Sequence, residues 1–457
     1  MSDDHSGPPV RRSRGHRAKH RFQNLIVDAT PLRLDHDYRW WWSGQLVTAI
    51  GNQVTRTALR YQIFVLTGSV LAVGALTLVQ FVAVLAFALV GGSIADAFDR
   101  RRVLLVAQIG MCATSLSLVV VSQMGAPSIP ALVVLAFVGA GLGAVDLAVR
   151  GSAVPRLVPR QRLPSALALN QLNGRMGAIV GPALGGVVIA AIGVPGAFAL
   201  DAATFIGSIT ALLVIRPIPP LDGARRAGLA AIREGLSFVL GRRLILSALA
   251  IDLIATILGT PTSLFPALAL DIFKVGPTGF GVLSAAPAVG ALIAMLLSGW
   301  IPLLRRTGRA LILSVAAWGV AITAFGLLTF SFPLAVLALA VAGGADVISS
   351  VLRSTLVQFE TPDELRGRVT SIYSMSAQSG SRLGDIEAAV LASIAGIQAS
   401  IIVGGMLCVL GVLAIARAIP ELPAHTILVD NLPRGRRARR TQIESIARLP
   451  PDTDILP

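Results

Sequence analysis

Long apolar segments recur along almost the whole of this 457-residue chain. Each is about 20 residues long, the length that a helix needs to cross the hydrocarbon core of a bilayer, and about twelve can be counted. They fall at 40–66, 70–92, 103–123, 130–153, 165–192, 196–216, 244–270, 278–302, 310–330, 333–356, 367–395 and 399–418. Only 14% of the residues are charged, and the mean hydropathy is +0.74. We therefore expect an all-α polytopic membrane protein with twelve transmembrane helices, not a soluble enzyme.

Basic residues gather in every second loop between these segments. Arginines precede the first segment and follow the second, fourth and eighth, whereas the intervening loops carry almost no Lys or Arg. By the positive-inside rule, both termini are expected in the cytoplasm and the chain in the cell (inner or plasma) membrane. This spread over many loops explains the net charge of +15 without a nucleic-acid partner. Because residues 1–37 are polar and basic, no cleavable signal peptide is expected.

The two halves of the chain repeat each other. Arg150 and Arg353 occupy equivalent places at the ends of the fourth and tenth segments, and Gly181 and Gly384 follow them at the same offset. The repeat predicts two pseudo-symmetric six-helix bundles, the arrangement on which alternating access is usually built. The expected divisions are a basic N-terminal tail (1–37), a first bundle (38–216), a linker with an amphipathic surface helix (217–243), a second bundle (244–418) and a C-terminal tail (419–457).

The fifth segment carries a comb of small residues. Gly177, Gly181 and Gly185 recur every fourth residue, so on a helix they form one bare face that another helix can approach closely. Pro182 adds a bend, and Gly186 extends the comb. Simple packing of two helices is one interpretation, and a hinge and seal on the outer half of a central cavity is the other.

The loop after the second segment combines glycine with charges of both signs. Gly92 allows a close turn, and Asp96 stands four residues before Arg100, close enough to pair with it. Together with Arg101 and Arg102, these residues form either a charged latch that breaks on switching or a solvated basic loop. Asp146 and Arg150, four apart near the inner end of the fourth segment, are predicted to be structural or gating partners.

These motifs resemble a known family. Asp96 with Arg100, Arg101 and Arg102 resembles the signature loop of the major facilitator superfamily, although Ala97 and Asp99 stand where that loop usually has a basic residue and a glycine. The glycine comb resembles the superfamily's antiporter motif. Three further stretches resemble its siderophore (enterobactin) exporter branch: Leu264-Phe265-Pro266-Ala267-Leu268-Ala269, Thr361-Pro362 with Leu365, Gly367 and Arg368, and Ser381-Arg382-Leu383-Gly384-Asp385-Ile386-Glu387-Ala388.

The resemblance covers about residues 33–418 and carries functional implications. It implies the major facilitator fold and export of a siderophore or similar metabolite by proton antiport, with the proton motive force in place of any cofactor. The same branch contains macrolide and multidrug pumps, so a multidrug efflux pump is the alternative. Such folds can work as monomers, and a monomer in the lipid bilayer is expected.

Ionisable side chains inside membrane segments are costly and usually face a cavity. Asp385 is the first candidate for the proton-coupling carboxylate and Asp252 the second. Arg382, three residues before Asp385, can pair with it, and a fixed ion pair is the alternative role for both. Asp201 and Asp271 are expected near the outer ends as capping or solvated groups. The remaining cavity candidates are Asn52, Arg56, Arg60, Arg175, Gln378 and Glu387.

The arginines among these candidates favour an anionic small-molecule substrate, such as a phenolate or carboxylate. No catalytic triad, phosphate-binding loop or metal-ligand cluster can be recognised, and Cys112 and Cys408 lie in separate segments. We therefore expect neither an enzyme nor a metal site. A receptor or scaffold that does not transport remains a further alternative, but it would not need polar stripes in both halves.

Overall fold

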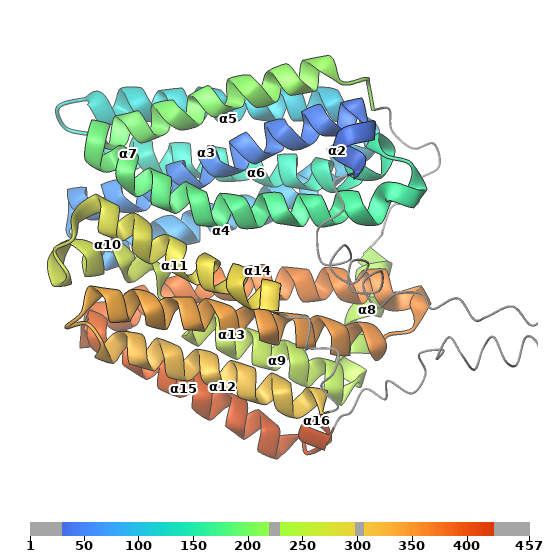
Figure 1. Cartoon of the computed structure of the whole chain (residues 1–457), viewed down its shortest axis with the longest axis vertical. Helices are drawn as coiled ribbons and strands as arrows, with labels where there is room; N and C mark the ends of the chain where they lie inside the picture. The colour runs from blue at the N-terminus through green and yellow to red at the C-terminus, as the bar shows by residue number, and fades with distance from the viewer. Residues whose placement is uncertain (1–29, 219–228, 298–305, 425–457) are drawn as a thin grey trace, which may run out of the picture.

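The computed structural model describes residues 30–218, 229–297 and 306–424, and every regular element in these ranges is helical (Figure 1). The first half contains α2 (Thr30–Leu34), α3 (His36–Thr67), α4 (Val70–Ala97), α5 (Arg100–Gln123), α6 (Ile129–Leu157), η1 (Arg160–Arg162) and α7 (Leu163–Val214). The second half contains α8 (Leu229–Gly241), α9 (Arg243–Leu258), η2 (Thr262–Leu264), α10 (Phe265–Ala267), η3 (Leu268–Ile272), α11 (Gly276–Leu297), α12 (Thr307–Leu327), α13 (Phe332–Phe359), α14 (Asp363–Ala395), α15 (Ile397–Ala418) and α16 (Glu421–Ala424).

Within the described ranges, nine helical stretches are long and apolar enough to cross a membrane. The helices α3 and α14 are outside these nine because each carries many polar and charged residues. Those two helices hold most of the predicted cavity residues. The expected count of twelve spans stays a prediction.

Two of the predicted segments are joined in one helical element, α7. Its backbone leaves the helical region only at Gly193, where φ is 75° and ψ is 178°. A positive φ of this kind suits glycine because a side chain would clash with the backbone. Pro195, two residues later, starts the returning helix, and Figure 1 shows the two parts of α7 running back along each other.

The segment that begins with α9 is broken rather than continuous. After Leu258 the chain passes through Gly259 and Pro261 into η2, α10 and the π-helix η3. Proline cannot donate its backbone nitrogen to a helical hydrogen bond, so a break at this point is expected. The break exposes backbone and hydroxyl donors in the interior of the molecule, and one of the candidate carboxylates uses them.

The described helices pack into two sets, α3 to α7 and α9 to α15, which Figure 1 shows on opposite sides of the molecule. One apolar cluster of buried residues is drawn wholly from 239–422. The other two come from 38–218, with Ala267 as the one buried member from the second half. Contacts of α4 with α14 and of α7 with α11 join the sets. The first and last described helices, α2 and α16, lie at one end of the molecule together with α8 (Figure 1); we call this the terminal end and the opposite one the distal end.

Large apolar side chains cover much of the outer surface. Examples are Val106, Ile192, Leu296 and Leu313, each exposed by two thirds or more, at 70%, 67%, 69% and 69%. Exposed apolar surface on this scale would be unstable in water and fits contact with lipid. Together with the nine apolar helices, this surface identifies an integral membrane protein.

Candidate functional site

An ion pair between the two sets of helices lies at the centre of the candidate site. Asp385 of α14 is buried, and its Oδ2 lies 3.5 Å from Nη2 of Arg60 in α3. Its Oδ1 accepts hydrogen bonds from the Thr262 hydroxyl at 2.5 Å and from the Ser263 backbone N–H at 2.9 Å. The Ser263 hydroxyl also donates to the backbone oxygen of Asp385, at 2.7 Å. One carboxylate therefore connects α3, α14 and the broken segment at η2.

The predicted pairing of Arg382 with Asp385 is wrong. Arg382 makes no ion pair with Asp385 in the part of the chain that the structure describes, and its guanidinium lies over the ring of Phe81 in α4, 5.9 Å from the ring centre. Three residues of separation bring two side chains to one side of a helix, but Asp385 is turned toward the donors of η2 and toward Arg60. Arg382 thus lies beside the pair, where its charge interacts with that of Asp385 from beyond ion-pair distance.

Three guanidinium groups share this region. Arg56 lies near enough to both Arg60 and Arg382 for the charges to interact, and its side chain is exposed although it stands in the middle of α3. Of the three, only Arg60 has a carboxylate within ion-pair distance among the described residues. The region around Asp385 therefore carries more positive than negative charge at short range.

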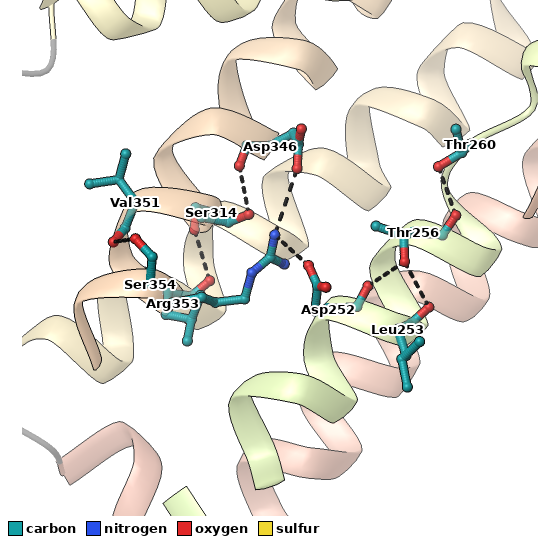
Figure 2. A network of polar contacts seen from close by, with 11 residues as sticks. Asp252, Leu253, Thr256, Thr260, Ser314, Asp346, Val351, Arg353 and Ser354 are labelled. Carbon is teal, nitrogen blue, oxygen red and sulfur yellow. Dashed lines mark hydrogen bonds and ion pairs between the residues drawn. The ribbon is translucent and has the colours of Figure 1, made fainter. Parts of the chain in front are cut away.

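A second buried ion pair connects α9 with α13, as Figure 2 shows. Nη2 of Arg353 lies 2.7 Å from Oδ1 of Asp252 and 3.8 Å from Oδ1 of Asp346. The side chains of Asp252 and Arg353 are 1% and 2% exposed, and that of Asp346 is 41% exposed. The charge of Asp346 also interacts with Arg175 of α7, so Arg175 approaches this network from the other set of helices. Asp252, the second candidate for proton coupling, is thus held in an ion pair.

The predicted partnership of Asp146 and Arg150 appears as an ion pair within α6. Nε of Arg150 lies 2.6 Å from Oδ2 of Asp146, and Gln108 of α5 donates to Oδ1 of Asp146 at 3.3 Å. Asp146 is buried, so the pair also joins α6 to α5.

Two arginines of the basic loop after α4 pack against the rest of the protein. Gly92 and Asp96 belong to α4, but the side chain of Asp96 and the surroundings of Gly92 lie outside the described part of the structure, so the latch stays a prediction. Arg100 is buried, and Arg101 donates to the backbone oxygens of Leu212 and Leu213 at 2.6 and 2.7 Å. Those oxygens belong to the last turn of α7, where a cation is favourable.

Asp99 explains one departure from the family's usual loop. Its side chain accepts a hydrogen bond from the backbone N–H of Arg102 at 3.1 Å, so it caps the first turn of α5. A glycine at this position could not make that bond. Arg102 itself is exposed beside Asp99.

The glycine comb contacts two different helices, α3 on one face and α11 on the other. Added Cβ atoms at Gly177, Gly181 and Gly185 would meet α3, at 3.0 Å from the Ala49 oxygen, 2.9 Å from the Ile50 oxygen and 3.4 Å from Cβ of Thr57. One residue further, Gly186 faces α11 of the other set, and a Cβ there would lie 2.9 Å from Cα of Gly281. The carbonyl oxygen of Pro182 lies beside Gly281 in the same crossing, 2.6 Å from the place of its missing Cβ.

The remaining predicted cavity residues, Gln378, Asn52 and Glu387, take no part in the ion pairs described above. Gln378 donates to the Ser374 oxygen of its own helix at 3.4 Å. Asn52 and Glu387 are half-buried and make no side-chain hydrogen bond or ion pair within residues 30–218, 229–297 and 306–424. In those same ranges no group of three or more His, Cys, Asp or Glu side chains is placed to hold a metal ion.

Three residues that matter here were not among the sequence-based candidates. In the sequence Arg353 stands out only as part of the repeat. The role of Gly281 is visible only in its contact with Gly186. Asp201 is predicted to be a capping or solvated group near the outer end, and the solvated role is wrong: Asp201 is 1% exposed and accepts hydrogen bonds from Thr55 and Ser115. The hydroxyls in neighbouring segments were the signal, but sequence does not say which helices touch.

A cavity of about 810 Å³ lies at the distal end between residues of both sets. It is lined by Phe64 and Val70 of the first half and by Asp271, Ala392 and Ile397 of the second, among others. Phe64 follows Arg60 by one helical turn, and Ala392 follows Asp385 by two. The cavity therefore begins within about two turns of the central ion pair.

Apolar helices that hold ion pairs between them are characteristic of membrane transporters, because charges inside a bilayer need partners or a pathway. Comparison with known families agrees. Residues 27–435 match the family described as transmembrane secretion effector. The chain belongs to this family of the major facilitator superfamily, whose members are transporters and not enzymes.

Known exporters are similar over most of the chain. The enterobactin exporter EntS of Shigella boydii serotype 18 is 28% identical, and EntS of Escherichia coli O1:K1 is 27% identical. Each match spans 369 residues and covers 79% of this chain and 86% of the relative. The resemblance recognised from the motifs is thereby confirmed.

Solved transporter structures share the fold. A bacterial homologue of the human lysosomal transporter Spinster, in an inward-facing and unoccupied conformation, has a TM-score of 0.69 at 13% identity, covering 86% of this chain and 99% of that one. A bacterial homologue of the iron transporter ferroportin, in an inward-facing state, has a TM-score of 0.65 at 14% identity, with 86% and 100% covered. At these identities the likeness concerns the fold alone.

Removing one partner of the Asp252–Arg353 pair is expected to lower the free energy of unfolding. Asp252→Ala leaves the buried guanidinium without its nearest counter-ion and should destabilise the protein by about 3 to 5 kcal/mol. The double variant Asp252→Leu with Arg353→Met replaces the pair with apolar groups and should recover most of that loss. Thermal unfolding of the purified protein in detergent measures both. A single variant as stable as the wild type would show that the pair carries no buried charge.

Proposed function

We propose that this protein is a proton-coupled exporter that works by alternating access. In this proposal twelve transmembrane helices form two six-helix bundles, both termini are cytoplasmic, and a monomer suffices. The proton motive force supplies the energy, and Asp385 is the carboxylate that takes up and releases the proton. The observation that carries the proposal is the Asp385–Arg60 pair between the two sets of helices.

The Asp385–Arg60 pair supports proton coupling because the attraction between the two side chains depends on whether Asp385 is protonated. An ionised Asp385 attracts Arg60 across the interface, whereas a protonated Asp385 keeps its contacts with η2 but loses the charge that holds Arg60. Proton uptake would therefore release α3 from α14 and allow the two bundles to separate on one side. The crossing of Gly186 with Gly281 supplies a close contact that can act as the seal on the outer side.

A siderophore or similar anionic metabolite is the proposed cargo. The similarity to two enterobactin exporters over 79% of the chain supports it. The local excess of guanidinium groups at Arg56, Arg60 and Arg382 supports an anion, since these groups bind carboxylate and phenolate oxygens well. A macrolide or multidrug pump of the same fold is the competing outcome of the test below.

Deleting the gene in its host and growing the cells under iron limitation tests the cargo. Iron-chelating activity in the medium is expected to fall and to return when the gene is restored on a plasmid. Growth in the presence of macrolides and cationic dyes is measured in parallel. Unchanged chelator secretion together with new sensitivity to these drugs would reject the siderophore and favour the multidrug pump.

Asp385→Asn is expected to abolish export while the protein still folds. The amide keeps an oxygen for Thr262 and Ser263 but can neither carry a charge for Arg60 nor exchange a proton. Export of the compound identified by the deletion is measured across a series of external pH values, with membrane insertion checked by immunoblot. Asp271→Asn, which changes an exposed carboxylate at the distal end, is the matched control. Wild-type export with an unchanged pH profile would rule out Asp385 as the coupling group.

The two faces of the comb predict different defects. Gly186→Leu should block export with little loss of thermal stability, because it obstructs only the contact with α11. Gly181→Leu should lower the melting temperature, since its side chain would collide with the Ile50 oxygen and Gln53 of α3 inside one set of helices. If Gly186→Leu exports normally, the crossing is a packing contact and not a seal.

A further inference from the structure

Four aspartates are buried within the described helices, and three of them have a guanidinium nearby. Asp146, Asp252 and Asp385 lie 2.6, 2.7 and 3.5 Å from Arg150, Arg353 and Arg60 respectively. The fourth, Asp201 in the second part of α7, has no cation within 4 Å among the described residues. Asp201 is also as deeply buried as any of them, at 1% exposure.

Neutral hydroxyl groups surround the Asp201 carboxyl group. Its Oδ2 accepts hydrogen bonds from Thr55 of α3 and Ser115 of α5, both at 2.7 Å. Its Oδ1 is buried and has no hydrogen-bond partner in the described part of the chain. A Cβ added to Gly51 of α3 would lie 2.6 Å from that oxygen, so only a glycine allows α3 to pass here.

Two titratable groups on neighbouring helices face this carboxyl group. Arg56, the residue after Thr55 on α3, is close enough for its charge to interact with that of Asp201, although it lies beyond ion-pair distance. Cys112 of α5 is the other, and its thiol donates to the backbone oxygen of Ala202 at 3.6 Å. From α7 itself, Thr204 contributes a hydroxyl that bonds the backbone oxygen of Asp201, at 2.7 Å.

This environment suits a carboxylic acid better than a carboxylate. An ionised carboxyl group buried without a counter-ion has a large desolvation cost, and such a group usually takes up a proton instead. The hydroxyls of Thr55 and Ser115 can accept as well as donate hydrogen bonds, so the protonated form keeps its partners. The burial, the unpartnered Oδ1 and the missing cation all point in the same direction.

We propose that Asp201 is a second proton-binding site, in the first set of helices, whose charge state acts on the central arginine cluster through Arg56. The proposal rests on the proton-coupled transport proposed above, but proton binding at Asp201 is tested without transport. With Asp201 protonated, the charge of Arg56 is uncompensated and adds to those of Arg60 and Arg382. When Asp201 gives its proton to water, its negative charge draws Arg56 away from that cluster.

The link to the central ion pair is short. Arg56 and Arg60 are one turn apart on α3, and Arg60 pairs with Asp385. Movement of Arg56 toward Asp201 reduces the repulsion between Arg56 and Arg60, which strengthens the hold of Asp385 on Arg60. The two carboxyl groups, one in each set of helices, are thus connected through a single turn of α3.

Infrared spectroscopy of the purified full-length protein in nanodiscs, without substrate, tests the proton site. At neutral pH the wild type should show a carbonyl stretch of a protonated, buried carboxylic acid. Asp201→Asn should remove the part of this band that Asp201 contributes, whereas Asp271→Asn should leave the band unchanged. Asp385→Asn should also keep the part of the band that Asp201 contributes. A wild-type spectrum without a protonated-acid band, or a band that is unchanged in Asp201→Asn, overturns the proposal.

A titration of the same band tests the link to Arg56. Arg56→Gln removes the positive charge that favours the ionised form of Asp201, so the pH at which the band disappears should move upward. A purely structural Asp201 would give no band to titrate, and an unchanged midpoint would overturn the link. Export that is insensitive to a protonophore, with the Asp201 band present, would reject proton coupling while leaving the binding site in place.

Discussion

The attraction between Asp385 and Arg60 is the interaction on which the arrangement of the site depends. Inside a membrane protein two such charges have little water to compete for them, so each depends on the other. Asp385 also holds Thr262 and Ser263, which fixes the break in the segment that begins with α9. A change in the charge of one carboxyl group is therefore felt by both sets of helices and by the broken segment between them.

The two halves pair their equivalent arginines with aspartates in different positions. Arg150 and Arg353 correspond in the repeat, and each has a buried aspartate beside it. In the first half the acid stands on the same helix and Gln108 assists it, so the pair mainly stabilises α6 against α5. In the second half the acid is Asp252 on another helix, and the pair ties α9 to α13. The repeat thus preserves the arginine while the position of its counter-ion differs.

Sequence predicted the features that depend on spacing along one helix. The apolar helices of the nine membrane-spanning stretches, the bare face of the glycine comb and the pairing of Asp146 with Arg150 all follow from helical periodicity, and the described residues show them. Sequence did not predict which side chains meet between helices that are distant along the chain. The partner of Asp385 is 325 positions away in sequence, at Arg60. Spacing along α14 favours Arg382 as the partner, because it identifies the face of a helix but not which helix covers that face.

Two of the contacts that join the sets of helices, α4 with α14 and α7 with α11, differ in the groups that they bring together. At one, Gly74 of α4 lies beside Ala389 of α14, one turn from Asp385, the carboxylate proposed to bind the proton. At the other, Gly186 meets Gly281, and the atoms nearest to the places of their missing Cβ atoms are backbone atoms of the two facing helices. In the proposed cycle, a proton therefore acts directly on only one of the two crossings. The contact between Gly186 and Gly281 responds only when the helices that carry it move.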